Sequence, residues 1–342
     1  MNKLKRNQNE ISLGYLKGNN LHTREKEVLK DASEKIGFIP DTLVGRSAWW
    51  GSSEMGAFHY KGIYEGKKAV LKIQGVKPNI SEREMISAFS KTNKSKVVRP
   101  PRLYAYLPWD EEKKYEALVM EFIDGKRLIQ VPTKASQIEK FFEIYRDYRK
   151  NCRRNPWVDK PEKTISESIV DRFTKWREMS FKIYPNHPLR EEGDNVLVDT
   201  AVRKLIKGYE GVQPEFVHGH LSDRDLYQMG DEVVVLSNLY WSWRAPFYDG
   251  IFAYHWFIYH LSDVKGITPK EVERQRNIWL KQINSLPGTQ SGEGKRLLKL
   301  ALLERAAAGL NLDALSTDCD KPISAYLVEA TREQVKNLLE NL

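Results

Sequence analysis

The sequence predicts an α+β fold with two lobes, a small antiparallel sheet followed by a larger helical part. Strand-like runs rich in aromatic and β-branched residues lie between residues 57 and 123. Segments with helical apolar spacing dominate after residue 126. Strands followed by helices are typical of α+β domains, and 342 residues are enough for two lobes. We expect residues 1–40 to form an N-terminal extension with a short helix, 41–124 the first lobe and 125–342 the second.

The composition is that of a soluble globular chain, with 41% hydrophobic and 30% charged residues. The longest apolar stretch, Ile251–Leu261, is too short to cross a bilayer. Polar residues follow the basic start of the chain, where a signal peptide would be apolar. Two cysteines, Cys152 and Cys319, cannot make a disulfide framework. We therefore expect a cytoplasmic protein without a membrane partner.

The chain carries a formal net charge of +9. Such an excess favours anionic partners such as nucleotides or nucleic acids, and it is equally compatible with an ordinary solvated basic surface. The longest basic cluster, Arg146–Arg154, is short and follows a helical stretch. Nucleic-acid binding would need clustered basic residues interleaved with stacking aromatics, so we expect no nucleic-acid partner.

The first lobe is expected to contain a hairpin, a capped helix and two further strands. Ala57–Tyr64 and Ala69–Ile73 read as two strands joined by a Glu-Gly turn. Ser81-Glu-Arg-Glu84 has the pattern of a capping box at the start of a helix. The remaining strands are expected at 102–107 and 115–123.

The rest of the chain is expected to be mainly helical. A loop surrounds His218, and Glu232–Leu236 reads as a short strand. The helical patterns, including one in the N-terminal extension, cover residues 23–36, 138–148, 165–183, 248–261, 270–283, 294–310 and 325–342.

A glycine-containing segment precedes the hairpin. Gly51-Ser-Ser-Glu-Met-Gly56 resembles the kinase glycine-rich loop G-x-G-x-x-G, with Ser53 at the middle glycine. Glycine lets backbone N–H groups approach phosphate oxygens closely. Two glycines beside a hairpin are also common turn residues, so this segment does not decide the function alone.

Lys72 ends the run Ala-Val-Leu-Lys on the second strand and resembles the kinase lysine that contacts the α- and β-phosphates. Glu84 on the following helix would orient Lys72 through an ion pair. Glu82 is a second candidate for this role, because Glu84 also fits the third position of the capping box. The alternative for Lys72 is an ordinary solvent-facing lysine on a strand that alternates apolar and polar residues.

Ala117–Gly125 resembles the strand, gatekeeper and hinge of small-molecule kinases. In this resemblance Met120 is the gatekeeper, and the backbone groups of Glu121 to Ile123 would meet an adenine edge. A buried strand that ends at a turn would show the same pattern.

The segment from His218 to Asp225, His-Gly-His-Leu-Ser-Asp-Arg-Asp, resembles the catalytic loop H-G-D-L-x-x-x-N of the aminoglycoside phosphotransferase and choline kinase group. Pro246–Ala253 resembles the P-x-x-Y-D-L-A segment of the same group, including Asp249. The five motifs follow one another in the family order between about residues 43 and 259. The resemblance implies a protein-kinase-like fold, with a nucleotide-binding hairpin and helix in the first lobe and the catalytic loop in the second. It also implies ATP and Mg²⁺ as cofactors.

The chain departs from the family at the residues that carry the chemistry. His220 stands at the position of the catalytic aspartate, and Asp225 at that of the metal-binding asparagine. The second metal-binding aspartate falls on Ser237, or on Asn238 if the loop differs by one residue. Magnesium prefers carboxylate oxygens, so only Asp225 offers a strong metal ligand.

Two functions follow from the resemblance, and they differ in whether catalysis survives. The first is a catalytically impaired, pseudokinase-like protein that binds a nucleotide and acts on a small-molecule substrate or protein partner by binding. The alternative is an active ATP-dependent phosphotransferase on a small-molecule hydroxyl, with His220 or Asp223 as the base and Asp225 for the metal. Asp223 in the sequence Ser-Asp-Arg-Asp is equally suited to forming a turn. A third reading is a scaffold that binds nucleic acid or another anion through its basic surface.

Overall fold

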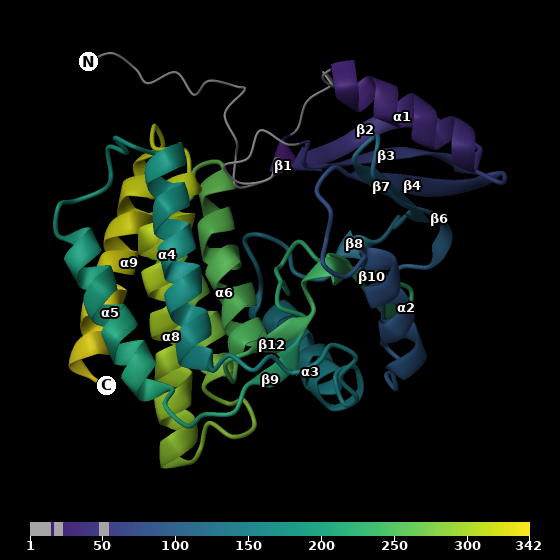
Figure 1. Cartoon of the computed structure of the whole chain (residues 1–342). Coiled ribbons are helices and arrows are strands. Elements are labelled where there is room, and N and C mark those ends of the chain that lie inside the picture. The colour runs from purple at the N-terminus through teal and green to yellow at the C-terminus, as the bar shows by residue number, and fades with distance from the viewer. Residues whose placement is uncertain (1–14, 17–22, 48–54) are drawn as a thin grey trace. The chain divides into compact units, whose positions relative to one another are not determined.

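A computed structural model of the chain describes residues 15–16, 23–47 and 55–342 (Figure 1). The chain divides into two compact units. Residues 1–87 and 101–124 form the first, called the sheet unit here, and residues 88–100 and 125–342 form the second, called the helical unit. Helix α2, Glu82–Thr92, passes from one unit into the other.

The helical unit takes residues 88–100, which the sequence analysis placed in the first lobe. Two contacts account for this. Strand β5, Val98–Arg99, pairs in parallel with β11, Glu232–Val235. Phe89 of α2 is fully buried, with its ring 5.8 Å from that of Trp157 and 4.8 Å from that of Trp241. The chain therefore returns to the sheet unit only at Pro101.

In the sheet unit, six strands among the described residues form one antiparallel sheet in the order β1-β2-β3-β4-β7-β6. Strand β7, which pairs with β4 on one side and β6 on the other, is buried along its whole length. The strand bounds are Tyr15–Leu16 (β1), Phe38–Ser47 (β2), Ala57–Tyr64 (β3), Lys67–Gln74 (β4), Leu103–Asp110 (β6) and Tyr115–Glu121 (β7).

The predicted hairpin is confirmed as β3 and β4, which pair from Ala57↔Gln74 to Tyr64↔Lys67. Its two turn residues, Glu65 and Gly66, have φ angles of 47° and 73°. A two-residue turn with both φ angles positive matches the right-handed twist of the strands that it joins.

Helix α1, Thr23–Ile36, was expected in an extension outside the first lobe, but it packs on the sheet. Its buried residues Val28 and Ala32 belong to the same apolar core as Phe38 and Leu71. The helix ends at Gly37, whose φ of 77° favours glycine. Packing on the sheet gives the helix the apolar partner that its amphipathic pattern requires.

Helices make up most of the helical unit (Figure 1). Their bounds are Ala135–Asn151 (α3), Ile165–Ile183 (α4), Asp194–Gly208 (α5), Tyr248–His260 (α6), Pro269–Ile283 (α7), Gly292–Asn311 (α8) and Pro322–Glu340 (α9). Helix α6 packs against α7 and α8 and is buried nearly all round, which explains why its sequence is an almost continuous apolar run. Among the described residues, no helix is both long and apolar enough to span a membrane.

Two small sheets of the helical unit position the loop around His218. One has the order β5-β11-β10-β8, where β8 is Lys126–Arg127 and β10 is Leu226–Met229. The other pairs β9, Glu215–Val217, with β12, Ser242–Arg244. The loop of residues 218–225 therefore leaves β9 and enters β10, held at both ends by strand pairing.

Candidate functional site

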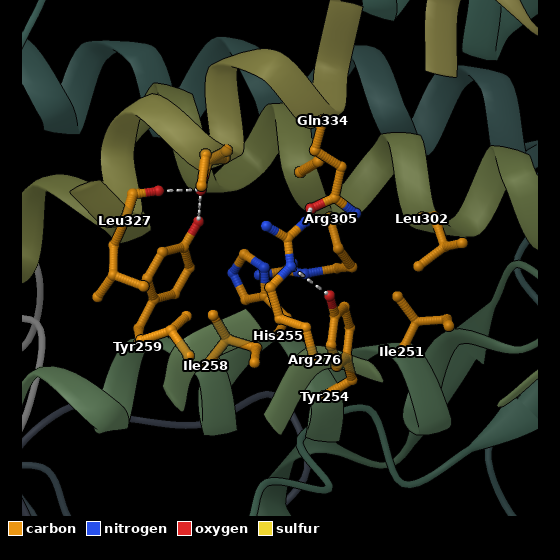
Figure 2. A pocket seen from close by; sticks show the side chains of 14 residues that line it. Ile251, Tyr254, His255, Ile258, Tyr259, Arg276, Leu302, Arg305, Leu327 and Gln334 are labelled. Atoms are coloured by element: carbon orange, nitrogen blue, oxygen red, sulfur yellow. Dashed lines mark hydrogen bonds between the residues drawn. The ribbon is translucent and has the colours of Figure 1, made fainter. Parts of the chain in front are cut away.

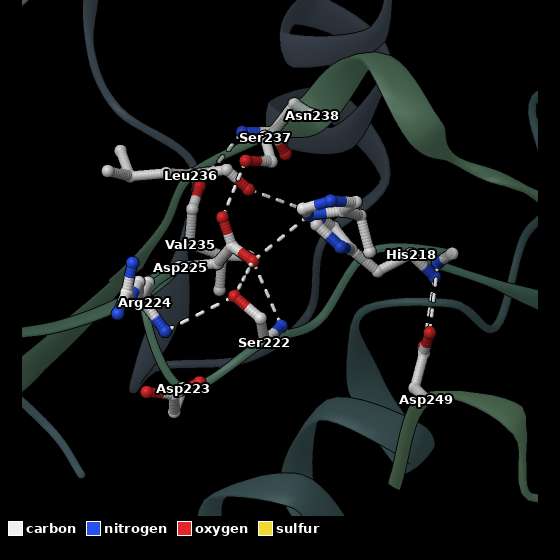
Figure 3. A network of polar contacts seen from close by, with 12 residues as sticks. His218, Ser222, Asp223, Arg224, Asp225, Val235, Leu236, Ser237, Asn238 and Asp249 are labelled. Carbon is white, nitrogen blue, oxygen red and sulfur yellow. Dashed lines mark hydrogen bonds and ion pairs between the residues drawn. The ribbon is translucent and has the colours of Figure 1, made fainter. Parts of the chain in front are cut away.

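Asp249, in the first turn of α6, holds the start of the 218–225 loop. This carboxylate is fully buried, and its Oδ1 accepts a hydrogen bond from the Gly219 N–H at 2.9 Å. Its Oδ2 accepts from the His218 N–H at 3.0 Å (Figure 3). The Tyr148 hydroxyl also donates to Oδ2, at 2.6 Å. Sequence reasoning missed Tyr148, because no local pattern links it to a loop 70 residues away.

The loop can follow this path only with glycine at position 219. Gly219 has a φ of 78°, and a Cβ atom there would lie 2.4 Å from the backbone oxygen of Tyr240. Both the backbone conformation and the close approach exclude an ordinary side chain. The glycine of the predicted catalytic-loop motif therefore has a structural cause in this chain.

His218 links the loop to the end of β11. Its Nε2 lies 2.9 Å from the backbone oxygen of Leu236, and since a carbonyl can only accept, Nε2 carries the hydrogen. Burial lowers the pKa of His218, so the ring is neutral at pH 7, and its edge packs against Trp241 at 5.2 Å. This hydrogen bond fixes Leu236, and with it Ser237, beside the loop.

Asp225 is the centre of a polar network that Figure 3 shows. Its Oδ1 accepts a hydrogen bond from the Ser237 hydroxyl at 2.5 Å. Its Oδ2 accepts from the Ser222 N–H at 2.9 Å and from the Ser222 hydroxyl, and it lies 3.2 Å from Nδ1 of His220. Burial acts to raise the pKa of Asp225, but His220 and the other donors outweigh it and hold the pKa below its ordinary range.

His220, at the expected position of the catalytic base, is half-buried beside Asp225. Its ring stacks on Tyr240 at a centroid distance of 4.5 Å and lies 5.1 Å from Phe252. Because Asp225 is ionised and can only accept, Nδ1 of His220 is the donor in this contact. The other ring nitrogen, Nε2, is then the one available to a ligand.

The two candidates for the second metal position have different hydrogen-bond partners. Ser237, with a φ of 59°, directs its hydroxyl to Asp225. Asn238 is fully buried and donates from Nδ2 to the Val235 oxygen at 2.8 Å, and it accepts at Oδ1 from Trp241 Nε1 at 3.1 Å. The side chain of Asn238 is thus used within the protein, and Ser237 is the residue that shares a site with Asp225.

Asp223, the other candidate base, is not brought into this network. Its carboxylate is fully buried and its Oδ1 lies 2.7 Å from Nδ1 of His260, in the last turn of α6. Figure 3 shows Asp223 directed away from Asp225. This arrangement gives Asp223 a partner that tethers the loop to α6.

In the sheet unit, Lys72 pairs with Glu82 and not with Glu84. Lys72 of β4 and Glu82 in the first turn of α2 are both buried and form a hydrogen-bonded ion pair. Glu84 is exposed, and its carboxylate accepts from the Ser81 N–H at 3.0 Å and the Ser81 hydroxyl at 3.1 Å. The Glu84 N–H donates back to that hydroxyl at 3.2 Å, which completes a capping box. The expected pairing with Glu84 is therefore corrected to Glu82.

The expected hinge lies at the end of β7. Met120 is buried beside Ile86 and Leu118, and Ile123 is half-buried just after the strand. The Glu121 N–H donates to the Arg102 oxygen at 2.9 Å, and the Glu121 carboxylate accepts from the Arg102 N–H at 2.9 Å. The Glu121 N–H is thus already used within the sheet unit.

The expected glycine-rich loop lies mostly outside the described residues, which include neither Gly51 nor Ser53. Gly56 is described, and its carbonyl accepts from the Gly75 N–H at 2.8 Å beside the hairpin.

The residues present do not fit a magnesium site. Within the described part of the chain, no group of three or more histidine, cysteine, aspartate or glutamate side chains could hold a metal ion. Asp225 is the one carboxylate in its network with Ser222, His220 and Ser237, and both of its oxygens already accept hydrogen bonds. Magnesium requires oxygen ligands in near-octahedral geometry, and Ser237 supplies only a hydroxyl.

Solved structures of small-molecule kinases share this fold. An aminoglycoside phosphotransferase, in a thermostable mutant form, matches with a TM-score of 0.58 and 11% identity, covering 91% of this chain and 98% of its own. Choline kinase from Cryptosporidium parvum Iowa II matches with a TM-score of 0.57 and 13% identity, covering 92% and 97%. An amicoumacin kinase in complex with AMP-PNP and Ca²⁺ matches with the same TM-score and identity, covering 92% and 93%. The chain therefore has the protein-kinase-like α+β fold.

No protein-family model matches the sequence, and no curated protein matches it.

Proposed function

We propose that the chain is a pseudokinase-like protein that binds a nucleotide and transfers phosphoryl groups very slowly or not at all. The observation that carries this proposal is the hydrogen bond from Ser237 to Asp225. Phosphoryl transfer from a metal-bound nucleotide needs carboxylate oxygens for the metal. In this chain the hydroxyl of Ser237 would stand where the family has one of these carboxylates. The same hydroxyl donates a hydrogen bond to an oxygen of the remaining carboxylate, Asp225.

Nucleotide binding is supported by the buried pair of Lys72 and Glu82. In kinases a lysine on this strand contacts the phosphates when a helix glutamate orients it, and Glu82 would play that part here. The backbone of Glu121 to Ile123 would meet the adenine, and the segment from Gly51 to Gly56 would cover the phosphates. Solved relatives of this fold hold ADP with hygromycin B, or AMP-PNP. An adenine nucleotide is therefore the ligand that we propose.

Loss of the usual base supports the proposed impairment. His220 brings no negative charge to the position at which the family keeps an aspartate, and losing an acid–base group typically costs about 10²- to 10⁴-fold in rate. The protein would then act by binding, with a nucleotide and a small molecule or protein partner as ligands.

One observation favours an active enzyme as the second candidate. Nδ1 of His220 faces the ionised carboxylate of Asp225 at 3.2 Å. A carboxylate that orients a histidine in this way leaves Nε2 as an acceptor, which is the arrangement of many general bases. Under this alternative the chain is an atypical phosphotransferase in which His220 accepts the proton of a substrate hydroxyl.

Calorimetric titration with ATP, with and without Mg²⁺, tests the proposal. We expect binding in both conditions, with less than about a threefold effect of Mg²⁺, since the site lacks its metal ligands. Lys72→Met should weaken binding at least tenfold. Lys68→Met, an exposed position on the same strand, is the matched control and should bind as the wild type does. Absence of ATP binding by a folded wild type would reject the proposal.

A further inference from the structure

Three arginines gather around one aromatic ring of the helical unit. Arg172 of α4, Arg244 of β12 and Arg305 of α8 place their guanidinium carbons 5.9, 5.5 and 6.0 Å from the centre of the Tyr248 ring. We call these three residues the arginine cluster. They come from three elements far apart in the sequence, so no local pattern could have predicted the cluster.

Two of the three arginines form ion pairs within the described part of the chain, and the third does not. Arg172 pairs with Glu304 at 2.6 Å and Arg305 pairs with Asp313 at 2.6 Å. Arg244 has no acidic partner within the described residues. Its cross-strand neighbour is Glu215, which pairs with arginines of α3 and the loop after it. Burial lowers the pKa of Arg244 and Arg172 adds to this effect, while the charges of Glu304 and Asp249 oppose it only in part.

Hydrogen-bond donors of the cluster are also left without acceptors. Within the described residues, Nε of Arg172, of Arg244 and of Arg305 is buried and has no hydrogen-bond partner. Buried donors in native proteins are nearly always paired. Aromatic faces lie beside the cluster: Phe252 is 5.0 Å from Arg305, and Trp176 is 5.8 Å from Arg172. A ring face attracts a cation but does not accept these N–H groups as an oxygen would.

The cluster lies close to the candidate catalytic loop. Phe252 is the link, because its ring is 5.1 Å from His220 and 5.0 Å from the guanidinium of Arg305. The arginines differ in access: the side chain of Arg305 is 4% exposed, that of Arg172 is 15% exposed and Arg244 is half-buried. A ligand would therefore reach the cluster first at Arg172 and Arg244.

The cavity on another side of Arg305 is too small for a ligand. Figure 2 shows this space between Arg305, His255 and Tyr259, with residues of α9 above it. Its volume is about 20 Å³, which is room for one water molecule. His255, whose pKa burial and Arg305 lower to about 4, is neutral at pH 7 and pairs with Asp313. On this side the guanidinium of Arg305 already has Asp313 as its ion-pair partner.

We propose that the arginine cluster binds an oxoanion, the carboxylate or phosphate of a small molecule whose apolar part packs on the nearby aromatic rings. A planar guanidinium presents paired N–H donors that match both groups. One such anion would give Arg244 an ion-pair partner and an acceptor for its unpaired N–H. The proposal concerns the helical unit alone and does not require nucleotide binding by the sheet unit.

Calorimetric titrations at constant ionic strength test the proposal. The probes are inorganic phosphate, phenyl phosphate and benzoate, with benzyl alcohol as the uncharged comparison. We expect saturable binding of at least one oxoanion and none of benzyl alcohol. A phosphate site should bind phenyl phosphate at least tenfold more tightly than benzoate, and a carboxylate site should show the reverse order. Absence of saturable binding for all three oxoanions would overturn the proposal.

Variants separate this site from the general basic surface. Arg244→Gln should weaken oxoanion binding at least tenfold. Arg244→Lys keeps the positive charge but lacks the paired N–H donors of the guanidinium, and it should weaken binding less. Arg203→Gln, an exposed position on α5, is the matched control and should bind as the wild type does. Equal binding by wild type and folded Arg244→Gln would overturn the proposal. Lys72→Met should leave phosphate binding intact, so a failure of ATP binding alone counts against the proposed function and not against this site.

Discussion

The hydroxyl of Ser237 donates a hydrogen bond to Oδ1 of Asp225 at 2.5 Å. In the proposed correspondence with the family that this chain resembles, Ser237 stands at the position of a metal-binding aspartate and Asp225 at that of an asparagine. The pair in this chain thus keeps a single carboxylate, and that carboxylate is satisfied from within the protein.

Stability should depend on the ionised state of Asp225. The pKa of Asp225 is held below its ordinary value in the folded chain. Its stabilising contribution is therefore present above the unfolded-state pKa of about 4 and is lost as the pH falls below it. Urea unfolding from pH 6 to pH 3 should show a steeper loss of stability for the wild type than for Asp225→Asn. Parallel curves would show that Asp225 does not contribute in this way.

Glu82 and Glu84 should differ sharply in their effect on stability. Glu82→Gln leaves the buried ammonium of Lys72 without its anion and should cost about 3 kcal/mol. Glu84→Ala removes only the exposed half of a capping box and should cost about 0.5–1 kcal/mol. Urea unfolding of both variants measures the difference. A larger cost for Glu84→Ala would contradict the assignment of Glu82 as the partner.

Gly219→Ala should be far more harmful than Gly211→Ala. Both glycines have a φ above 70°, so each substitution pays about 1–2 kcal/mol of backbone strain. Only at Gly219 does the new Cβ also approach a backbone oxygen, at 2.4 Å, while at Gly211 nothing lies within 4 Å. Thermal unfolding should therefore show a much lower midpoint for Gly219→Ala. Similar midpoints would mean that the loop path around Asp249 is not constrained as described.

Restoring the family carboxylates should restore metal-dependent binding. The double substitution His220→Asp with Ser237→Asp should make ATP binding at least tenfold tighter in Mg²⁺ than without it. His220→Asp with Asn238→Asp is the matched control and should not, because Asn238 is buried in contact with Val235 and Trp241. Calorimetry measures both. If the control gained the metal dependence, the register of this segment would be wrong.

The sequence predicted most elements whose pattern is local. The β3–β4 hairpin was visible because a Glu-Gly turn joins two alternating runs. Strand β2 was missed because Pro40 and Gly45 disfavour a strand, and the structure accommodates them at two shifts of register. Helix α5 was also missed, although its buried residues Val198, Ala201 and Leu205 recur every three or four positions.

The candidate site was partly predictable for the same reason. The motif from His218 to Asp225 is contiguous, so its residues could be named from the sequence. The choice between Glu82 and Glu84 could not be made, because both lie in the first turn of α2 and only their direction distinguishes them. The arginine cluster required the packing of α4, β12 and α8 around Tyr248 of α6, which no short sequence pattern encodes.

Phosphoryl transfer by the purified wild type tests the central claim most directly. We predict that ATP in the presence of Mg²⁺ is bound but not turned over above the rate of the His220→Ala variant, because neither the usual base nor the usual metal ligands are present. Product formation from ATP, followed with and without the candidate oxoanion ligands, is the measurement. Robust Mg²⁺-dependent turnover that His220→Ala abolishes would contradict the account and establish the chain as an active phosphotransferase with a histidine base.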